Sequence, residues 1–482
     1  MRSTVLRVFA CTGATGKLLV HLNWGILCVI GFSMLAAQNK AIGLQALIDR
    51  LAEARNYTDK SFEIVRADSL YERPIPERHR IVFYIGHLEA FDLNLFRSQA
   101  PALRPYAPEF DKLFAFGIDP VNGGLPTDRP QDWPRLSQIN SYKKEVRHLL
   151  DGAIQAGDFQ SGDASAQHSA QTLLNVAIEH RLMHAETLAY MFHQLPFERK
   201  HAQPQASPSE GAFRAEMLQI PEGSATLGLE RRDAQQFGWD NEFEAFETEV
   251  PAFRIDKYMV TNGEFLEFLR SGDYEDREFW SEENWRWKQE RNIQHPVFWI
   301  RANGNWHYRG MFEELPLPLY WPVYVSWAEA SAYAKWAHKS LPTEAQWHRA
   351  AYGTPQGSEL TYPWGNDAPR PGLGNFDFSR WDPVPVSSFP LNKSVFGVQG
   401  QLGNGWEWTE SLFEPFAGFQ PFSFYPGYSA DFFDGKHYVM KGGSARTAAS
   451  MLRRSFRNWF QPRYQYAYAG FRCVSNESET AD

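Results

Sequence analysis

Apolar residues recur every three or four positions through much of the first 200 residues, which is the spacing of helices that bury one face. This spacing predicts helices in four segments: LQALIDRLAEAR, RIVFYIGHLEAFDLNLF, SQINSYKKEVRHLLDGAIQAG and QTLLNVAIEHRLMHAETLAYMFHQL. The intervening segment FGIDPVNGGLPTDRPQDWPR is too rich in proline and glycine to be helical. The pattern therefore predicts a helical bundle over residues 41–200.

The pattern changes after the polar segment HAQPQASPSEGAF, residues 201–213, which is typical of a linker. Residues 214–482 contain short strand-like runs such as FRIDKYMVT, one helix in WAEASAYAKWAHKS, and many turns with Gly, Asn and Trp. No repeat at the spacing of a solenoid is visible. We therefore expect two domains of different architecture.

Residues 1–40 contain the apolar run WGILCVIGFSMLAA, which is short for a membrane-spanning helix and far from the N-terminus for a signal peptide. Three interpretations remain open: a membrane anchor, a poor signal peptide, or translated upstream sequence with the true start at Met34. The third is favoured because nothing after this region is typical of an exported protein. Three cysteines exclude a disulfide scaffold and favour a reducing compartment. A cytoplasmic protein is expected, with membrane anchoring or export as the minority interpretation.

The charge balance argues against nucleic acid and anionic membranes as partners. The chain has 48 basic and 57 acidic residues, a net charge of -9, and no basic stripe. Small-molecule ligands suit such a chain better. Aromatic residues make up 15% of it, with 17 Trp, and a Trp-dense, loop-rich half usually buries its indoles between irregular segments.

The segment AIEHRLMHAETLAY places two histidines and a glutamate on an otherwise apolar helix. His180 and His184 are four residues apart, so they lie on one helix face about one turn from each other, and they can bind a metal together. A pair of this kind is more often solvated or satisfied in a core, and a metal needs ligands from another helix. His87, on the earlier apolar segment FYIGHLEAFDL, is the candidate for a third ligand; the alternative is a core histidine bonded to a backbone carbonyl.

Three neutral imidazoles would suit Fe(II), Zn(II) or another first-row ion and would leave coordination positions open for substrate and for dioxygen or water. Glu186 is either a hydrogen-bond acceptor that orients an imidazole N–H or a solvated charge, and both interpretations stay open. His168 and His193 have no such neighbours, so we expect them at the surface.

Six motifs between residues 251 and 474 resemble, in order, the domain shared by formylglycine-generating enzymes and the ergothioneine-forming sulfoxide synthases called EgtB: PAFRIDKYMVTNGEFLEFL, PVYVSWAEASAYAKWAHKSLPTEAQWHRAAYG, YPWGN, LGNGWEWTESLF, KGGSAR and YAGFRCV. The resemblance implies a C-type-lectin-like fold for residues 214–482. The glycines permit turns that other residues do not, and the tryptophans are expected to pack in a core: Gly403, Gly405, Gly442 and Gly443, and Trp336, Trp347, Trp406 and Trp408.

The two branches of this family differ in their metal sites. Formylglycine generators use a pair of cysteine thiolates after the GGS motif, but GGSARTAASMLRRSFRNWF has none, and Cys473 is expected to be a small buried residue. The EgtB branch begins with a DinB-like four-helix bundle, in which an H-x3-H-x-E motif and one earlier histidine bind a mononuclear non-heme iron. The resemblance thus implies an α+β multidomain fold, with Fe(II) on His87, His180 and His184 and O2 as co-substrate.

The resemblance also implies substrate-facing residues. FYPGYSADFF matches the Y-x-x-Y-S motif of EgtB, so Tyr425 takes the place of the active-site tyrosine and Tyr428 the second position; the alternative is packing on a Trp-rich loop. FRNWFQPRY is similar to the R-N-W segment, so Asn458 and Trp459 are candidates for holding the substrate. Trp459 either faces a trimethylammonium group by cation–π attraction or belongs to the core.

The sequence departs from the EgtB pattern where substrates bind. Phe460 replaces an acidic residue that helps to hold the amine of the thiol, and Phe91 and Met183 replace two glutamines of the substrate site. A tyrosine pair found in some members has no counterpart in LFAFGIDPVNGG. The pocket should therefore be less polar than that of an ergothioneine maker. Arg129 and Arg463 are candidates for a carboxylate clamp, although exposed arginines are usually only solvated.

The resemblance implies an O2-dependent oxidoreductase that forms a C–S bond between a thiol and a small imidazole or amine acceptor. One alternative keeps the iron but makes the reaction a thiol dioxygenation or hydroxylation without coupling. Another is a small-molecule-binding protein without catalysis, against which the complete set of three histidines argues.

Overall fold

The computed structural model describes residues 24–97, 100, 103–115, 125–157, 169–203, 211, 213–231 and 236–475, with side chains from residue 43 onward. Residues Met1–Asp49 and Arg50–Asp482 form two units, and the second contains residues 214–482 together with the predicted helical domain from residue 50 onward. His168 lies outside the described residues. Within the described ranges, no helix has the combined length and apolarity that crossing a membrane requires.

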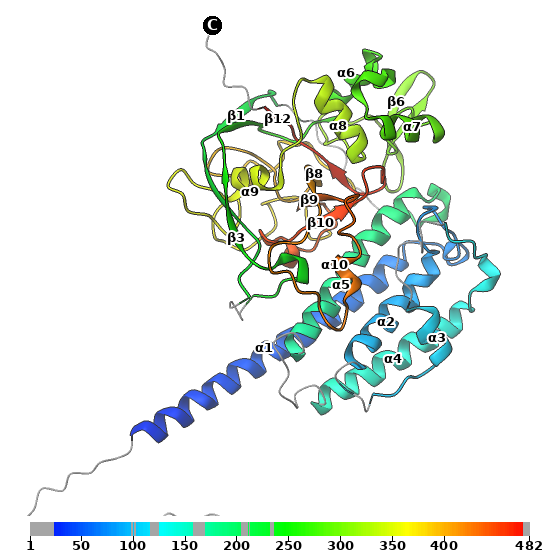
Figure 1. Ribbon diagram of the computed structural model, residues 1–482. Helices are drawn as coiled ribbons and strands as arrows, with labels where there is room; N and C mark the ends of the chain where they lie inside the picture. The colour runs from blue at the N-terminus through cyan, green and yellow to red at the C-terminus, as the bar shows by residue number, and fades with distance from the viewer. Residues whose placement is uncertain are drawn as a thin grey trace, which may run out of the picture. The chain divides into compact units, whose positions relative to one another are not determined.

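The N-terminal half is a bundle of long helices, as the periodicity predicts (Figure 1). Helix α2 packs against α4 and α5. Helix α5 begins where the Ser169 side chain accepts a hydrogen bond from the Thr172 amide, and it ends before Pro196, while α4 ends at Gly157 in the left-handed conformation. The helices are α1 (Trp24–Phe62), α2 (Ile81–Arg97), α3 (Pro108–Leu113), α4 (Leu136–Ala156) and α5 (Ala170–Gln194).

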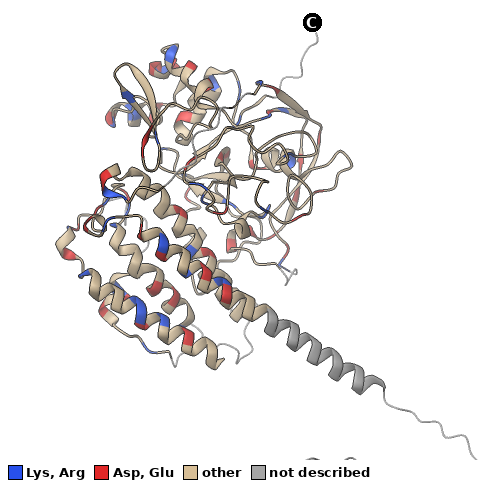
Figure 2. Ribbon diagram, turned by 180° about the vertical axis from the view of Figure 1, so that it is seen from behind, with Lys and Arg blue, Asp and Glu red and all other residues tan. Residues whose placement is uncertain are grey.

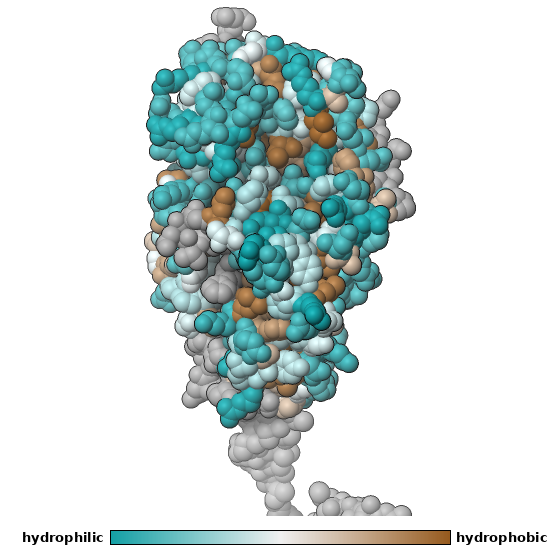
Figure 3. Space-filling model, turned by 90° about the vertical axis from the view of Figure 1, so that its right-hand side faces the viewer, coloured by the Kyte–Doolittle hydropathy of each residue, from teal (hydrophilic) through white to brown (hydrophobic). Residues whose placement is uncertain are grey.

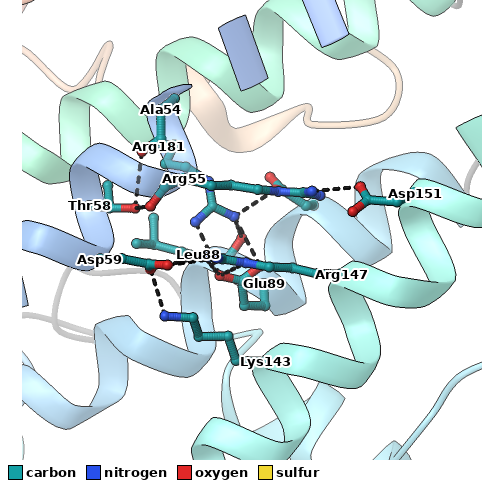
Figure 4. Close-up of polar contacts among 11 residues, drawn as sticks. Ala54, Arg55, Thr58, Asp59, Leu88, Glu89, Lys143, Arg147, Asp151 and Arg181 are labelled. Atoms are coloured by element: carbon teal, nitrogen blue, oxygen red, sulfur yellow. Dashed lines mark hydrogen bonds and ion pairs between the residues drawn. The ribbon is translucent and has the colours of Figure 1, made fainter. Parts of the chain in front are cut away.

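A buried cluster of ion pairs connects α1, α2, α4 and α5 (Figure 4). Arg181 on α5 is fully buried and pairs with Glu89 at 3.2 Å and with Asp92 at 2.7 Å, both on α2. Arg147 on α4 extends the cluster to Glu89 and to Asp59 on α1, each at 2.7 Å. Burial alone would raise the pKa of Glu89, but the charges of Arg181 and Arg147 outweigh it and lower that pKa to about 2. Glu89 is therefore ionised at neutral pH, whereas at Asp92 burial outweighs the charge of Arg181 and raises the pKa.

The C-terminal half contains four small sheets and several short helices around a core rich in aromatic residues. Strand β8 pairs antiparallel with β9, where Trp408 lies opposite Met440, and parallel with β11. The sheets have the orders β1-β4-β12, β10-β9-β8-β11, β2-β3 and β5-β6-β7. The strands are β1 (Met217–Ile220), β2 (Gly223–Leu227), β3 (Phe246–Val250), β4 (Phe253–Asp256), β5 (Trp299–Ala302), β6 (Asn305–Arg309), β7 (Glu314–Pro316), β8 (Gly405–Leu412), β9 (Tyr438–Gly443), β10 (Asn458–Phe460), β11 (Ala469–Gly470) and β12 (Val474–Ser475).

The helix predicted in WAEASAYAKWAHKS is present as α8 (Trp327–Trp336), but the prediction of a single helix in this half is wrong. The further helices α6 (Asn262–Arg270), α7 (Glu282–Glu290) and α9 (Glu344–Tyr352) have nine residues each, and α10 (Gly427–Ala430) is a single turn. Helices this short show little periodicity in sequence. Hydrogen bonds at their N-termini stabilise these helices. At the start of α6, for example, Thr261 and Glu264 form a capping box.

The core residues expected from sequence are largely confirmed. Trp347, Trp406, Trp408 and Cys473 are buried, whereas Trp336 is only partly buried. The backbone at Gly403 and Gly442 has φ values of 91° and 97°, which other residues rarely adopt. A Cβ atom on Gly442 would also lie 2.7 Å from the backbone oxygen of Gln401, so this turn requires glycine.

The expectation that His193 is a surface residue is wrong, because its side chain is fully buried where α5 meets the C-terminal half. Its Nε2 lies 2.6 Å from the backbone oxygen of Arg309, which can only accept, so Nε2 carries the proton. The Tyr468 hydroxyl therefore donates to Nδ1, at 3.0 Å. Burial, followed by the charge of Lys200, lowers the pKa of His193 to about 3.

Charges of both signs are interspersed over the two halves in Figure 2. The face shown in Figure 3 is mostly hydrophilic, with apolar residues in small groups. Both views agree with the charge balance of the sequence, which favours small-molecule ligands over a polyanionic partner.

Replacing Arg181 by methionine tests the ion cluster. We expect the Arg181→Met variant to lose about 3–5 kcal/mol of unfolding free energy, because Glu89 and Asp92 would stay buried without their shared cation. Urea unfolding measures this loss. Arg270→Met removes an exposed ion pair with Glu267 and should cost less than about 1 kcal/mol. Equal losses in the two variants would contradict a special role for the buried cluster.

The buried neutral His193 predicts a pH dependence of stability. Its folded pKa of about 3 lies below the ordinary 6.5, so its contribution is complete above pH 6.5 and declines as the pH falls towards 3. Between pH 6.5 and 5.0 the decline from this one residue is about 2 kcal/mol. His193→Gln should therefore lose less stability than the wild type over this interval, as measured by urea unfolding at both pH values. Parallel losses in the two proteins would show that His193 is protonated in the folded state.

Candidate active site

Three histidines from two helices converge in the bundle. His87 on α2 and His180 and His184 on α5 are all buried, and one ring nitrogen from each lies within 4.8 Å of the other two. The ring centroids of His180 and His184 are 4.4 Å apart, and that of His87 lies 5.4 Å from the first and 4.9 Å from the second. His87 is far from His180 and His184 in the sequence. It lies next to them in the structure because α2 packs along α5.

The geometry of the three imidazoles suits a metal ion. The Nδ1 atom of His87 lies 2.7 Å from the backbone oxygen of Phe114, so it donates its proton there and directs the lone pair of Nε2 towards the other two rings. The Nε2 atoms of His180 and His184 are 3.1 Å apart. Two ligands about 2.1 Å from one ion and at right angles to each other would be separated by about 3.0 Å. The three residues therefore fit a mononuclear site with three nitrogen ligands.

The protein keeps these imidazoles neutral, which is the form that binds metals. Burial lowers the pKa of His87 to about 4. Burial also lowers the pKa values of His180 and His184 well below the ordinary value, and the positive charges of Arg78 and Arg181 contribute to the shift at His184. A divalent cation at this position would therefore displace few protons at neutral pH.

Glu186 is buried and hydrogen-bonds to the C-terminal half instead of to an imidazole. It accepts hydrogen bonds from Trp406 Nε1 and from the Thr447 hydroxyl, each at 2.8 Å, and from the Ser444 hydroxyl. The interpretation as a solvated charge is therefore wrong, and no contact supports the interpretation as a partner of an imidazole. This carboxylate joins α5 to the KGGSAR segment beside the three histidines.

A cavity of about 190 Å³ opens over the three histidines, many times the space that a single water needs. The lining includes four residues that the sequence places near a substrate: Tyr425, Tyr428, Asn458 and Trp459. The two arginines predicted to bind a carboxylate do not line the cavity. Arg129 is largely exposed beside Asp132, and Arg463 pairs with the exposed Glu283.

The aromatic candidates for substrate binding, Tyr425, Tyr428 and Trp459, pack against neighbouring aromatic rings. The ring centroid of Tyr425 is 5.4 Å from that of Phe91 and 5.5 Å from that of Tyr428. Tyr428 stacks on Trp239 at 4.0 Å, and Trp459 stacks on Phe413 at 4.1 Å. These rings form one continuous cluster, so cavity-lining and packing roles coexist in the same residues.

The departures from the EgtB pattern are apolar residues at the cavity. Phe91 stacks on the imidazole of His180, with 3.4 Å between centroids. The Met183 sulfur lies 3.5 Å from the Tyr428 hydroxyl, and Phe460 stacks on Tyr464 at 4.8 Å. The surroundings of the three histidines thus offer aromatic and thioether surface at the positions where the EgtB pattern has amides and a carboxylate.

The structure adds residues to the cavity that the sequence did not single out. Arg78 belongs to the loop before α2, and Tyr190 lies on α5 beyond the recognised motif. Phe456 and Arg457 belong to the segment that resembles R-N-W, and Tyr468 begins the YAGFRCV motif. The motifs mark these segments, but only the packing of the two halves shows which of their residues reach the cavity.

Fold and site together define a class of protein: a helical bundle with a buried three-histidine centre, and a mixed α/β domain that contributes to the lining of the cavity beside that centre. Residues 202–477 match the family model described as the sulfatase-modifying factor enzyme 1-like domain. A hercynine oxygenase of Mycolicibacterium smegmatis is 32% identical over 444 residues, which cover 89% of this chain and 99% of that protein. The chain therefore belongs to the sulfatase-modifying factor family and, within it, to the EgtB-type branch.

Two further relatives match over shorter parts of their length. A hercynine oxygenase of Mycobacterium tuberculosis is 40% identical over 249 residues, which cover 51% of this chain and 57% of that protein. An ergothioneine biosynthesis protein 1 of Neurospora crassa is 27% identical over 92% of this chain and 59% of its own length. The chain thus spans less than two thirds of these two relatives.

Removing one histidine tests the metal centre. We expect the wild type to bind close to one divalent first-row ion per chain. His180→Ala should bind the ion more than about 100-fold more weakly, because the loss of a metal ligand lowers the affinity more than the loss of a residue that only orients a ligand. Metal analysis after equilibrium dialysis measures the stoichiometry. His307→Ala, which removes a partly exposed imidazole paired with Glu314, should bind as the wild type does. Wild-type binding by His180→Ala would refute the ligand assignment.

Proposed function

We propose that the chain is a mononuclear non-heme Fe(II) enzyme that uses O2 to form a C–S bond between a thiol and a small imidazole or amine acceptor. The observation that carries this proposal is the convergence of three buried, neutral imidazoles on one side of a cavity. Three protein ligands leave further coordination positions for substrate and dioxygen. The names of the relatives, which refer to hercynine and to ergothioneine biosynthesis, support an imidazole acceptor.

The iron, when bound, would supply the activation of dioxygen and the redox chemistry. The protein's own residues bind, orient and exclude water. Tyr425 lines the cavity, and its phenol would donate a proton to a reacting group. Asn458 and Trp459 both line the cavity, so an amide and an indole would both be available to a substrate there.

An anaerobic titration tests the metal and the acceptor together. The Fe(II)-loaded protein is exposed to nitric oxide as a substitute for dioxygen, and its EPR spectrum is recorded while hercynine, histidine or cysteine is added. We expect an iron-nitrosyl signal that shifts saturably with hercynine, because an imidazole acceptor would lie beside the open positions. Absence of a nitrosyl signal at one iron per chain would refute the iron centre. A signal that ignores hercynine would refute this acceptor.

Tyr425→Phe tests the proposed proton donor. The ring packing against Phe91 and Tyr428 does not need the hydroxyl, so the variant should fold and retain iron. We expect its turnover to fall by about 10²–10⁴-fold, the usual contribution of a positioned acid or base, or its product to change. Unchanged turnover and product, measured by mass spectrometry of the reaction mixture, would remove Tyr425 from the mechanism.

A further inference from the structure

A fourth histidine, His437, lines the same cavity as the three that converge at the metal site. It directly precedes strand β9, and its residue is 8% exposed. Its ring centroid lies 5.2 Å from that of Phe432, which in turn lies 5.6 Å from that of Trp459. The backbone oxygen of His437 also accepts a hydrogen bond from the Phe413 amide, and the Phe413 ring stacks on Trp459. His437 therefore belongs to the part of the cavity wall near Trp459.

A tight turn before β9 orients this imidazole. The Asp434 Oδ1 atom accepts a hydrogen bond from the Lys436 backbone N–H at 2.8 Å and lies 2.9 Å from His437 Nδ1. Gly435, between them, has a φ of 70°. Burial alone would raise the pKa of Asp434, but the hydrogen bond with His437 outweighs it and lowers that pKa, so the carboxylate is ionised and can only accept. The proton of the neutral imidazole is therefore on Nδ1.

The other ring nitrogen of His437 is open. No hydrogen bond from a described residue reaches its Nε2, and this nitrogen is not sealed from solvent. With the proton on Nδ1, Nε2 presents a lone pair. Glu186 is the only carboxylate among the described residues that line the cavity, and three hydrogen bonds from the C-terminal half engage it. His437 is thus an acceptor in the wall that is available to a hydrogen-bond donor of a substrate.

The charge of the pair favours a cationic donor. The ionised Asp434 balances a protonated His437 and leaves a neutral His437 beside a negative charge, so the pair carries no net positive charge in either form. A protonated amine supplies both an N–H donor and a positive charge, and burying it without a partner would be costly. The rings of Phe432 and Trp459 near the imidazole would also attract a cation through their faces.

We infer that His437, oriented by Asp434, is a substrate-binding residue that accepts a hydrogen bond from a protonated primary or secondary amine of a substrate. This inference rests on the proposed function, because it takes the cavity beside the metal centre to hold the substrates. The amine belongs either to the imidazole or amine acceptor or to the thiol, and its chemistry at His437 is the same in both cases.

Two pairs of ligands test the inference. In each pair, N-methyl groups replace the ammonium hydrogens, so the positive charge is retained and the N–H donors are lost. The pairs are histidine with hercynine, and cysteamine with its N,N,N-trimethyl derivative. Isothermal titration calorimetry with the full chain, loaded anaerobically with Fe(II), measures the affinity for each ligand. The decisive quantity is the affinity for the primary amine divided by that for its trimethylated form.

We expect His437→Phe to lower this ratio at least about 10-fold in one or both pairs, because a hydrogen bond to a charged group contributes at least this factor. A fall for histidine and hercynine assigns the amine to the acceptor, and a fall for the two thiols assigns it to the thiol. Ratios that stay at the wild-type value in both pairs would overturn the inference. Failure of the wild type to bind either primary amine would overturn it as well.

Further variants separate hydrogen bonding from packing. His437→Gln keeps an acceptor oxygen and should retain part of the ratio. Asp434→Asn should lower the ratio less than His437→Phe, because the imidazole stays but loses the charge that fixes its tautomer. His307→Phe disrupts a histidine–carboxylate pair outside the cavity and should keep the wild-type ratios; a fall of the same size there would contradict the assignment. If His437→Phe does not fold, by circular dichroism, wild-type ratios in Asp434→Asn would overturn the inference.

The metal content of every sample separates this inference from the proposed function. If the wild type binds no iron, the proposed function fails before any ligand is added. If it binds one iron per chain and the ratios do not depend on His437, only the role of His437 fails.

Discussion

The buried contact between Arg181 and the two acidic residues Glu89 and Asp92 is the constraint on which the site depends. Arg181 directly follows His180, and Glu89 lies two residues after His87, so this contact sets the position of α5 against α2 next to the imidazoles. A buried guanidinium without these carboxylates would be costly, so the two helices have one strongly preferred register. In that register the three histidines converge, and their burial keeps them neutral.

A second pair of carboxylates attaches the bundle to the C-terminal half. Glu179 and Glu186 lie seven residues apart on α5, about two turns, and therefore on one face of the helix. Glu179 pairs with Arg453 at 2.7 Å and accepts a hydrogen bond from Trp239 at 2.8 Å, while Glu186 bonds to the KGGSAR segment. His180 and His184 lie between these two anchors in sequence, but about a third of a turn further round the helix. The two histidines line the cavity beside Glu186, together with residues of the C-terminal half.

The chemistry of the cavity follows from what surrounds the metal site. Phe91 lies against the imidazole of His180, and Phe460 stacks on Tyr464, so the surroundings of the three histidines and of the cavity are largely aromatic. Surfaces of this kind give binding energy through apolar contact. The family fold is retained, while a few residues at the site differ from the EgtB pattern.

The sequence by itself determined the long helices, the change of architecture near residue 201 and the family, because helix periodicity is local and the motifs are contiguous. It also placed His180 and His184 on one face, since four residues make about one turn. Only the tertiary structure brought His87 to them, buried His193, directed Glu186 to Trp406, and put Arg78 in the cavity while Arg129 and Arg463 stayed outside. These outcomes depend on contacts between residues far apart in the chain, whose partners no local pattern specifies.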